Sequence, residues 1–374
     1  MHVLHTFSNN SSVPYLTWFA ERAEREGNIR YTFLNLYPEQ PEMMDEMRRL
    51  GFECRWIGYD QNHRRSGMLK ALPQLWRYMQ HFRPDIVHCN LFDDTVPGLI
   101  AARLAGIKIR ITTRQDTGFH WMHAPRWVAW DRKNTQRSTH LIAISEESRR
   151  FLIEKEKTPA EKITLVHNGI PPDRFTKKDE RVMEDLRSRF GANGRFPIIG
   201  TVARFIEWKG YRQIVEVAGA VTREFPDALF LLCGEGDQRS EIEALVKEKG
   251  LDRNVVFTGW IDRKYMASFY GILDVYLHAA VLEPFGLVYA EAMMNGVTVV
   301  STPTGAALDA IESGKNGFLA ERNADALGAA VHKALVADRK EVGAAGRRTA
   351  LEKFNFDVMW NGTTDLYRNA IASL

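Results

Sequence analysis

Cysteine and long apolar runs are the two features that this sequence lacks most clearly. The chain has 374 residues and three cysteines, Cys54, Cys89 and Cys233, which lie too far apart for a zinc cluster and form no obvious disulfide framework. We expect them to be small buried side chains in a reducing compartment. No apolar run approaches the roughly 20 residues that a membrane helix needs, and the short apolar stretch at the N-terminus has no basic leader. The sequence therefore predicts a soluble cytoplasmic protein.

The chain also lacks a large excess of positive or negative charge, because its formal net charge is only +3. This balance gives no indication of nucleic-acid binding. The first 170 residues carry a modest excess of Lys and Arg, and the rest of the chain carries a small excess of Asp and Glu. The basic excess suits an anionic membrane surface or a phosphate-bearing ligand, and ordinary surface variation explains it equally well.

Short apolar runs rich in β-branched residues alternate with longer helical patterns along the chain. This alternation indicates an α/β fold, with parallel sheets that helices cover on both faces. The predicted strands are 3–7, 30–34, 54–57, 85–89, 109–113, 140–144 and 163–166 in a first series, and 198–203, 229–233, 255–258, 275–278 and 298–301 in a second. The predicted helices include 14–25, 42–50, 68–81, 95–105, 146–155, 208–224 and 238–249. Two such series predict two similar domains, each with its ligand site at the carboxyl ends of its strands.

A polar stretch separates the two series. Pro171 and Pro172, a charged run at 177–181 and the segment 191–194 with a glycine at each end interrupt the alternation. We therefore place a first domain at 1–170, a linker at 171–195 and a second domain at 196–353. An aromatic-rich C-terminal segment, 354–374, follows.

Residues 283 to 291 hold two carboxylates, Glu283 and Glu291, on either side of a turn with Gly286. The apolar stretch that follows predicts a helix, so free backbone N–H groups near Gly286 and Leu287 face an anion with the positive end of the helix dipole behind them. A diphosphate fits there, while Glu283 can reach a sugar and Glu291 can accept hydrogen bonds from a ribose diol. The segment favours a sugar-nucleotide site, although two carboxylates at this spacing are often solvated surface groups.

A second motif lies upstream, where Arg204 ends a predicted strand and Lys209-Gly210 follows five residues later. The two motifs, in this order along the chain, resemble those of the GT-B glycosyltransferases, and most closely those of the retaining enzymes of glycosyltransferase family 4. The residues that carry the donor signature are Glu283, Phe285, Gly286, Leu287 and Glu291. By this resemblance Arg204 and Lys209 neutralise the diphosphate of the donor.

The resemblance implies an architecture and a reaction. The architecture is the GT-B fold, in which two Rossmann-like, doubly wound domains face each other across a cleft and the C-terminal segment, here 354–374, crosses back to the first domain. Residues 1–170 would bind the acceptor and 196–353 the nucleotide-sugar donor. The reaction would move a hexosyl-type sugar, from a UDP-sugar on family frequency, to a saccharide or lipid-linked acceptor in glycan or surface polysaccharide biosynthesis. Configuration would be retained, with Glu283 positioning the donor sugar and a leaving-group oxygen taking the proton of the acceptor.

No metal and no other cofactor is expected. The sequence lacks the Asp-x-Asp motif that chelates Mg²⁺ or Mn²⁺ in the GT-A glycosyltransferases, since Asp93 and Asp94 are adjacent. Asp94 is interpreted as a helix cap instead. The charges of Arg204 and Lys209 and the helix start at Gly286 would stabilise the leaving diphosphate without a metal.

Weaker matches accompany the donor motifs. Gly234 resembles a strand-end glycine beside the nucleotide, and Trp260 follows a strand that enters the base pocket in the family. After the donor helix, Gly305 keeps the family pattern, but Ala306 replaces its usual second glycine and Asp309 its usual Glu. A glycine after a strand is often only part of a turn, so these matches are weak alone.

The acceptor domain departs further from the family. In place of paired glycines after the first strand it has Asn9, Asn10 and Ser11, which either bond the acceptor through their side chains or cap the next helix. The family histidine near the transferred sugar falls at Gln115 or Asp116, which are acceptor-binding candidates. His120 is the substitute catalytic candidate, with a packed or surface histidine as the alternative. His88 is expected to be a core residue.

Three further questions stay open at this level. A sugar-nucleotide 2-epimerase shares the GT-B fold, and a non-catalytic sugar-nucleotide-binding protein is a third class, although the combined Arg204, Lys209, Glu283 and Glu291 set favours transfer. The helix at 68–81 is both amphipathic and basic, so it suits either peripheral contact with the inner membrane face or a stripe that faces the core. No side chain in the sequence identifies the acceptor or the base of the donor nucleotide.

Overall fold

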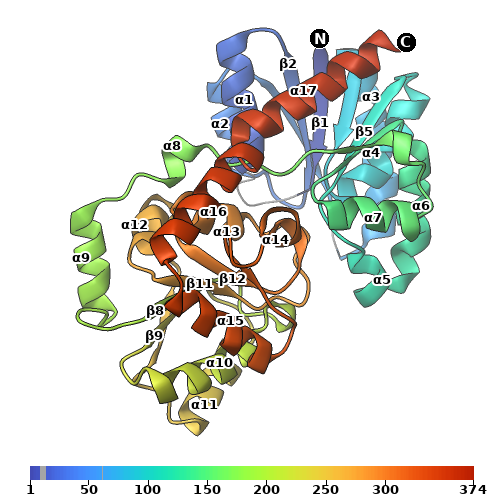
Figure 1. The fold of residues 1–374 in the computed structure, drawn as a ribbon. Helices are drawn as coiled ribbons and strands as arrows, with labels where there is room; N and C mark the ends of the chain where they lie inside the picture. Colours follow the sequence, from blue (N-terminus) through green and yellow to red (C-terminus); the bar gives the residue numbers. More distant parts are fainter. Residues whose placement is uncertain (9–13, 61) are drawn as a thin grey trace. The chain divides into compact units, whose positions relative to one another are not determined.

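The computed structural model describes residues 1–8, 14–60 and 62–374 (Figure 1). The chain divides into two units. The first unit comprises residues 1–166 together with 360–374, and the second comprises residues 167–359. Each unit contains one parallel sheet, which confirms the prediction of two α/β domains.

A seven-stranded parallel sheet forms the centre of the first unit, as far as the chain is described. Its strands in spatial order are β3 (Glu53–Gly58), β2 (Arg30–Tyr37), β1 (His2–Phe7), β4 (Ile86–Cys89), β5 (Ile109–Arg114), β6 (His140–Ala143) and β7 (Ile163–Leu165). The helices between them are α1 (Pro14–Glu26), α2 (Met43–Arg49), α3 (Arg64–Phe82), α4 (Phe92–Leu104), α5 (Phe119–His123), α6 (Val128–Arg137) and α7 (Glu146–Glu154). Every residue of β4 is buried, as expected for a parallel strand that is covered on both faces.

The second unit has a six-stranded parallel sheet. Its strands in spatial order are β10 (Val255–Gly259), β9 (Leu229–Cys233), β8 (Ile198–Val202), β11 (Val275–His278), β12 (Thr298–Ser301) and β13 (Phe318–Leu319). Its helices are α8 (Pro172–Phe175), α9 (Glu180–Arg189), α10 (Tyr211–Glu224), α11 (Arg239–Glu248), α12 (Met266–Gly271), α13 (Leu287–Met294), α14 (Gly305–Ala310), α15 (Ala324–Val336) and α16 (Arg339–Lys353). The core cluster of the unit lies largely between the sheet and helices such as α10, whose Ile214, Ala218 and Val221 recur at helical spacing and are buried.

The last helix, α17 (Phe356–Ala372), begins in the second unit, and its residues from Trp360 onward belong to the first. Trp360 is buried against Phe19, with ring centroids 5.2 Å apart. The Tyr367 hydroxyl lies 2.6 Å from Nδ1 of His88 and 3.4 Å from Nε2 of His5. The prediction of a core histidine at His88 is confirmed, and burial lowers its pKa to about 3. The helix therefore supplies side chains to the core of the first unit.

Most predicted strands occur with bounds close to those expected, and the segment 171–195 is the one that we expected as a linker. It contains α8 and α9 and lies in the second unit. Residues 167–170, which we expected in the first domain, also lie there, because Ile170 pairs with Asn355 in a parallel bridge. The predicted helices also did not include α5, α6, α12, α14, α15 and α16. Helix α6 has a mostly polar sequence, so it lacks the regular spacing of apolar residues that predicts a helix.

The cysteines and the helices agree with two expectations about composition. Cys54, Cys89 and Cys233 are free and buried, as expected for small core side chains. In the described parts of the chain, no helix combines the length and the apolar character that crossing a bilayer requires.

Candidate functional site

The donor candidates of the second unit gather where two adjacent strands end. Strands β8 and β11 are neighbours in the sheet, with Tyr276 paired to Gly200. Arg204 and Lys209 follow β8, and Glu283 follows β11, in the loop that leads to α13. Ligands of open α/β sheets bind at this carboxyl edge, so the sequence motifs come together where a ligand is expected.

Glu283 is buried and forms an ion pair with Lys209, with Nζ 2.5 Å from Oε2. The same oxygen lies 3.1 Å from Nε2 of His278, a fully buried residue at the end of β11. Burial raises the pKa of Glu283, but the hydrogen bond from His278 and the charge of Lys209 outweigh it and lower the pKa to about 2. Glu283 is therefore an ionised carboxylate that two partners hold in place.

The turn before α13 depends on glycine. Gly286 has φ +79°, and a Cβ there would lie 2.5 Å from the Tyr289 ring and 2.8 Å from Cγ of Glu283. Gly305 approaches the same loop closely, since a Cβ on it would lie 2.7 Å from the Phe285 carbonyl oxygen. Ala306, which replaces the usual glycine, donates its backbone N–H to that oxygen at 2.9 Å. The loop from 283 to 286 is thus held tightly against the start of α14.

Glu291 lies one turn into α13 and is buried. Its Oε2 accepts a hydrogen bond of 2.9 Å from the Tyr270 hydroxyl, and burial raises its pKa although the charge of Arg263 lowers it. The sequence did not single out Tyr270, Arg263 or His278. Each lies outside the two motifs and is brought to them only by the fold.

The other donor candidates differ in exposure. Arg204 is exposed, and its side chain makes no hydrogen bond or ion pair with the described residues, so its guanidinium faces solvent. Trp260 is 67% exposed, and Leu287 is half-buried. Gly234 follows β9 with φ +137°, and its backbone N–H donates to the Gly259 carbonyl. Phe285 is instead buried against Phe354, so its side chain supports the loop.

The acceptor candidates lie in the first unit. Asn9, Asn10 and Ser11 fall outside the described residues. Gln115, Asp116 and His120 line one cavity of about 240 Å³ at the carboxyl ends of β4 and β5. The sequence analysis related these three residues to the position of one family histidine, and in the structure they line the same cavity.

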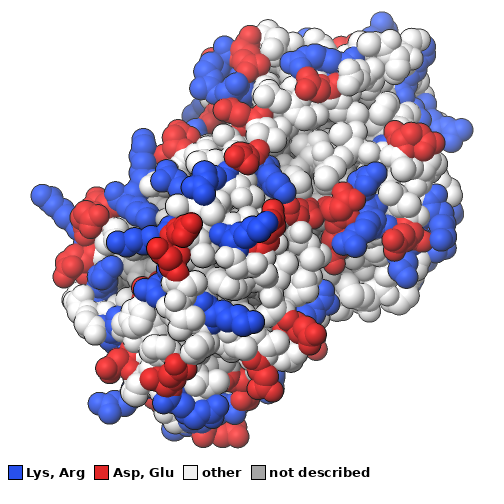
Figure 2. All heavy atoms as spheres, in the orientation of Figure 1, with Lys and Arg blue, Asp and Glu red and all other residues white. Residues whose placement is uncertain are grey.

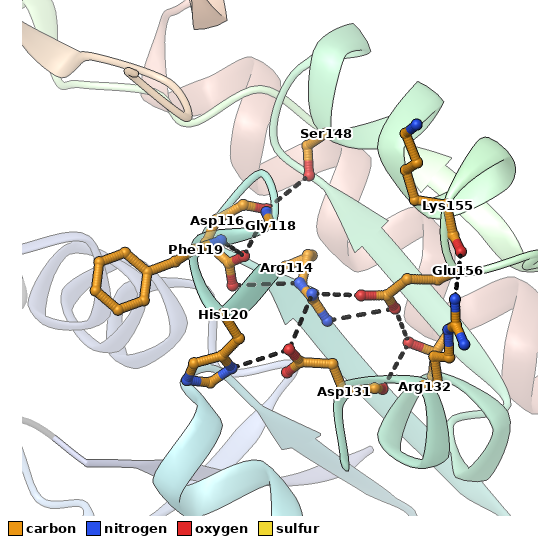
Figure 3. A network of polar contacts seen from close by, with 11 residues as sticks. Arg114, Asp116, Gly118, Phe119, His120, Asp131, Arg132, Ser148, Lys155 and Glu156 are labelled. Atoms are coloured by element: carbon orange, nitrogen blue, oxygen red, sulfur yellow. Dashed lines mark hydrogen bonds and ion pairs between the residues drawn. The ribbon is translucent and has the colours of Figure 1, made fainter. Parts of the chain in front are cut away.

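Four residues that line that cavity, Arg114, Asp116, His120 and Asp131, belong to a charged network with Glu156 (Figure 3). Arg114, at the end of β5, is buried and bonds Glu156 at 2.5 Å, with Asp116 at 3.2 Å and Asp131 at 3.9 Å. His120 Nδ1 lies 2.9 Å from Asp131. Burial lowers the pKa of Arg114, but the three carboxylates outweigh it and raise that pKa. Sequence reasoning missed Arg114, Asp131 and Glu156, because their association depends on separate elements.

Asp94 was expected to cap a helix that begins at residue 95, but α4 begins at Phe92 and Asp94 is the third residue of its first turn, from which it bonds back to the residues before the helix. Its carboxylate accepts backbone hydrogen bonds from Leu91 at 2.8 Å and Asn90 at 3.0 Å, and hydroxyl bonds from Thr6 and Ser8. Burial raises its pKa to about 7 in spite of these bonds. This carboxylate belongs to the core of the first unit.

Two family models match the chain. Residues 19–174 match "Glycosyltransferase Family 4", and residues 182–349 match "Glycosyl transferases group 1". The chain belongs to the GT-B glycosyltransferases. The two matches cover most of both units of this glycosyltransferase, so the family resemblance of its donor motifs extends to the whole fold.

Solved structures confirm the fold of this glycosyltransferase. HepE from Anabaena, crystallised with UDP and glucose, has a TM-score of 0.83 and 18% identity, over 99% of this chain and 100% of that one. Sucrose-phosphate synthase from Thermosynechococcus elongatus has a TM-score of 0.83 and 20% identity, over the full length of both chains. At these identities the likeness establishes the GT-B fold alone.

Curated relatives match over part of their length. The 2-deoxystreptamine glucosyltransferase of Streptomyces kanamyceticus is 29% identical over 254 residues, which is 64% of this chain and 65% of the relative. EpsF of Bacillus subtilis, a putative glycosyltransferase, is 29% identical over 207 residues, which is 54% of this chain and 53% of the relative. The chain thus spans less than two thirds of the length of these relatives.

Proposed function

We propose that the protein transfers a hexosyl-type sugar from a nucleotide-diphosphate sugar to a saccharide or lipid-linked acceptor, in glycan or surface polysaccharide biosynthesis. The observation that carries the proposal is the Lys209–Glu283 ion pair at the ends of β8 and β11, beside the glycine turn that opens α13. Family membership supports it. The donor, the acceptor and the pathway are all parts of the proposal.

The leaving diphosphate would meet two cations and a helix start. Arg204 is exposed at the end of β8, and the Lys209 ammonium has three N–H donors, of which the described contacts use one for Glu283. The first N–H groups of α13 add the positive end of the helix dipole. Preorganised donors of this kind stabilise charge as it develops on the diphosphate, so the proposed reaction needs no metal or other cofactor.

Transfer would proceed with retention of configuration. The anomeric carbon–oxygen bond to the diphosphate breaks, and a bond to the acceptor oxygen forms on the same face of the sugar. The proton of the acceptor hydroxyl passes to an oxygen of the departing diphosphate. Glu283, kept ionised by Lys209 and His278, positions the sugar and stabilises positive charge near the anomeric carbon without forming a bond to it.

In the donor, Glu291 is proposed to bind the ribose, and Gly234 and Trp260 to lie beside the nucleotide. In the first unit, Gln115, Asp116 and His120 are proposed to position the acceptor around their shared cavity. UDP is the proposed nucleotide, and the UDP and glucose bound by the structurally similar HepE support it. The relatives carry transferase names and add nothing in favour of an epimerase.

Donor turnover tests this function directly. The purified protein is incubated with UDP-sugars and GDP-sugars, with and without saccharide and lipid-linked acceptors, while release of the nucleoside diphosphate is measured. We expect release from one donor that rises with acceptor and falls sharply in Glu283→Gln. A change of the donor sugar into its 2-epimer would identify an epimerase instead, and donor binding with no change of donor would identify a binding protein.

The partners proposed do not include nucleic acid. Basic and acidic side chains are interspersed on the face that Figure 2 shows, and the net charge is +3. A single basic patch, which nucleic-acid binding uses, is not visible on that face.

We also propose a cytoplasmic location with peripheral contact at the inner membrane face, through α3. Met68, Leu75 and Met79 of this helix face the core, whereas Leu69 is 72% exposed and Trp76 is 40% exposed. Lys70 and Arg77 are exposed beside them, and α3 contains no acidic residue. Exposed apolar side chains with flanking cations suit an anionic lipid surface.

Sedimentation with vesicles tests the membrane contact. We expect the protein to sediment with vesicles rich in phosphatidylserine, and less with neutral phosphatidylcholine vesicles. Leu69→Ser with Trp76→Ser should reduce sedimentation, whereas exchange of an exposed apolar residue of the second unit, Val336→Ser, should not. Equal sedimentation of all three proteins would argue against α3 as the contact.

A further inference from the structure

The cavity of the first unit contains more negative charge than its own side chains balance. Three carboxylates, Asp116, Asp131 and Glu156, surround the single guanidinium of Arg114. Glu156 is wholly buried and lies closest to Arg114, so it is the natural partner of that cation. Asp116 and Asp131, which line the cavity, supply the excess.

Asp131 presents an unused acceptor. Both of its side-chain contacts, with His120 and with Arg114, are made by Oδ2, as Figure 3 shows. Within the described residues Oδ1 accepts no hydrogen bond. Because a carboxylate oxygen seeks several donors, Oδ1 is available to a ligand in the cavity.

Asn134 supplies a second acceptor at the same wall. It lies three residues after Asp131 on α6, hence on the same face of that helix, and it lines the cavity. The residue is 4% exposed, and its side-chain oxygen has no partner in the described structure. Buried polar atoms are normally bonded, so this oxygen indicates a group that arrives with a ligand.

His120 gives a third acceptor. Its Nδ1 lies 2.9 Å from Oδ2 of Asp131. In the tautomer that donates from Nδ1 to that oxygen, Nε2 is an acceptor for a ligand. A carboxylate that fixes a histidine in this way orients the ring for one ligand atom.

Three acceptors and excess negative charge call for a ligand group that has several donors and a positive charge. A hydroxyl group offers one donor and leaves the charge uncompensated. Among the described residues no cluster of three His, Cys, Asp or Glu side chains is arranged to hold a metal ion. An alkylammonium group has three N–H donors, no acceptor and one positive charge, and therefore matches the wall formed by α6.

The size of the cavity limits the rest of the ligand. About 240 Å³ is below the roughly 300–1,000 Å³ of sites for drug-sized ligands, and it suits one six-membered ring. We propose that this cavity binds an amino sugar or aminocyclitol, with its ammonium held by Asp131 and Asn134 and a neighbouring hydroxyl facing His120. That this ligand is the sugar acceptor rests on the proposed function, whereas its binding does not.

Three matched sugars test the inference in the intact protein. D-glucosamine, D-glucose and N-acetyl-D-glucosamine differ only in the group at C2, and their binding is measured by calorimetry at about pH 7, where most of the amine is protonated and an ordinary imidazole is mostly neutral. We expect glucosamine to bind roughly tenfold or more tightly than either neutral sugar, since charge-assisted bonds are about twice as strong as neutral ones. Equal binding of the three sugars would overturn the proposal.

Two variants and one control assign the ammonium site. Asp131→Asn removes the charge with little change of shape, and Asn134→Ala removes the unpaired oxygen without touching Arg114 or His120. Both should weaken glucosamine binding several-fold and leave the affinity for glucose unchanged, while Asp365→Asn, an exposed carboxylate of the same unit, should change neither. If Asp131→Asn does not fold, as judged by thermal unfolding, the Asn134→Ala result decides. Unchanged glucosamine binding in the folded variants contradicts the assignment.

Donor turnover separates this inference from the proposed function. Slow release of the nucleoside diphosphate without acceptor depends on the second unit and should be equal in wild type and Asp365→Asn. Donor turnover without selective glucosamine binding refutes the ammonium site alone. Selective binding without any donor turnover refutes the proposed function and leaves the site standing.

Discussion

At the scale of single residues, the two cations of the donor motif have different surroundings. Arg204 is exposed without a protein partner, whereas Lys209 is paired with a buried carboxylate. Arg204→Ala should therefore leave thermal stability unchanged and lower turnover by roughly 10²-fold, as loss of one preorganised donor does in other enzymes. Arg348→Ala, which removes an exposed guanidinium from α16, is the matched control. Near-normal turnover of Arg204→Ala at saturating donor would remove it from the site.

Lys209→Met should change both activity and stability. Without the ammonium, Glu283 remains buried with only His278 as a partner, and an uncompensated buried charge is costly. We expect turnover to fall at least as much as in Arg204→Ala, and the melting temperature to fall as well. Lys209→Arg keeps the charge and should be milder in both measurements. A Lys209→Met protein with wild-type stability would show that the ion pair contributes little to the fold.

The two carboxylates should separate kinetically. Glu291 is assigned to the ribose, which does not change during the reaction, so Glu291→Gln should mainly raise KM for the donor. Glu283 is assigned to the sugar under transfer, so Glu283→Gln should lower kcat more than it raises KM. Steady-state kinetics with varied donor distinguishes the two patterns. The opposite pattern would reverse the assignment.

Asp94 should give the first unit a pH-dependent stability. Its ordinary pKa of 3.8 rises to about 7 in the folded protein. Between these values the folded state binds more protons at Asp94 than the unfolded state does, so stability falls as the pH rises, by at most about 1.4 kcal/mol per pH unit from this group. Thermal unfolding between about pH 4 and about pH 7 should show this slope, and Asp94→Asn should reduce it. An unchanged slope would assign the dependence to other groups.

At the scale of secondary-structure elements, the start of α13 depends on one backbone angle. Gly286→Ala places a methyl group against Tyr289 and Glu283 at φ +79°, a strain of order 1–3 kcal/mol. We expect weaker donor binding together with lower stability, since the loop carries Glu283. Gly328→Ala is the control, because its Cβ would meet nothing closer than 4.0 Å and its helix favours alanine. Equal effects of the two substitutions would argue against a strained turn.

The elements also show what the sequence could and could not reveal. Strands β9, β11 and β12 have the predicted bounds, because each is an uninterrupted apolar run of buried residues or nearly so. Helix α6 was missed because its buried positions are Asp131, Asn134 and Thr135, which give no apolar period. The motifs placed Glu283 and Lys209 in one site, but not in contact, because 74 positions separate the two residues along the chain. His278 lies only five positions before Glu283, but no motif includes it, and the hydrogen bond between them is seen only in the folded turn. Long-range pairing of polar side chains is therefore the part that pattern reasoning leaves out.

At the scale of the whole molecule, one unit is continuous in sequence and the other consists of two separate segments. The second unit is formed by the continuous segment 167–359, whereas the first begins at residue 1 and is completed by residues 360–374. Those last residues include Trp360 and Tyr367, both fully buried. A ribosome that synthesises the chain from the N-terminus will therefore release every residue of the second unit before the first can complete its core. Until residues 360–374 have been made, the first unit lacks the Trp360 ring that packs against Phe19 and the Tyr367 hydroxyl that contacts His88. It is therefore the unit that chaperones are expected to protect.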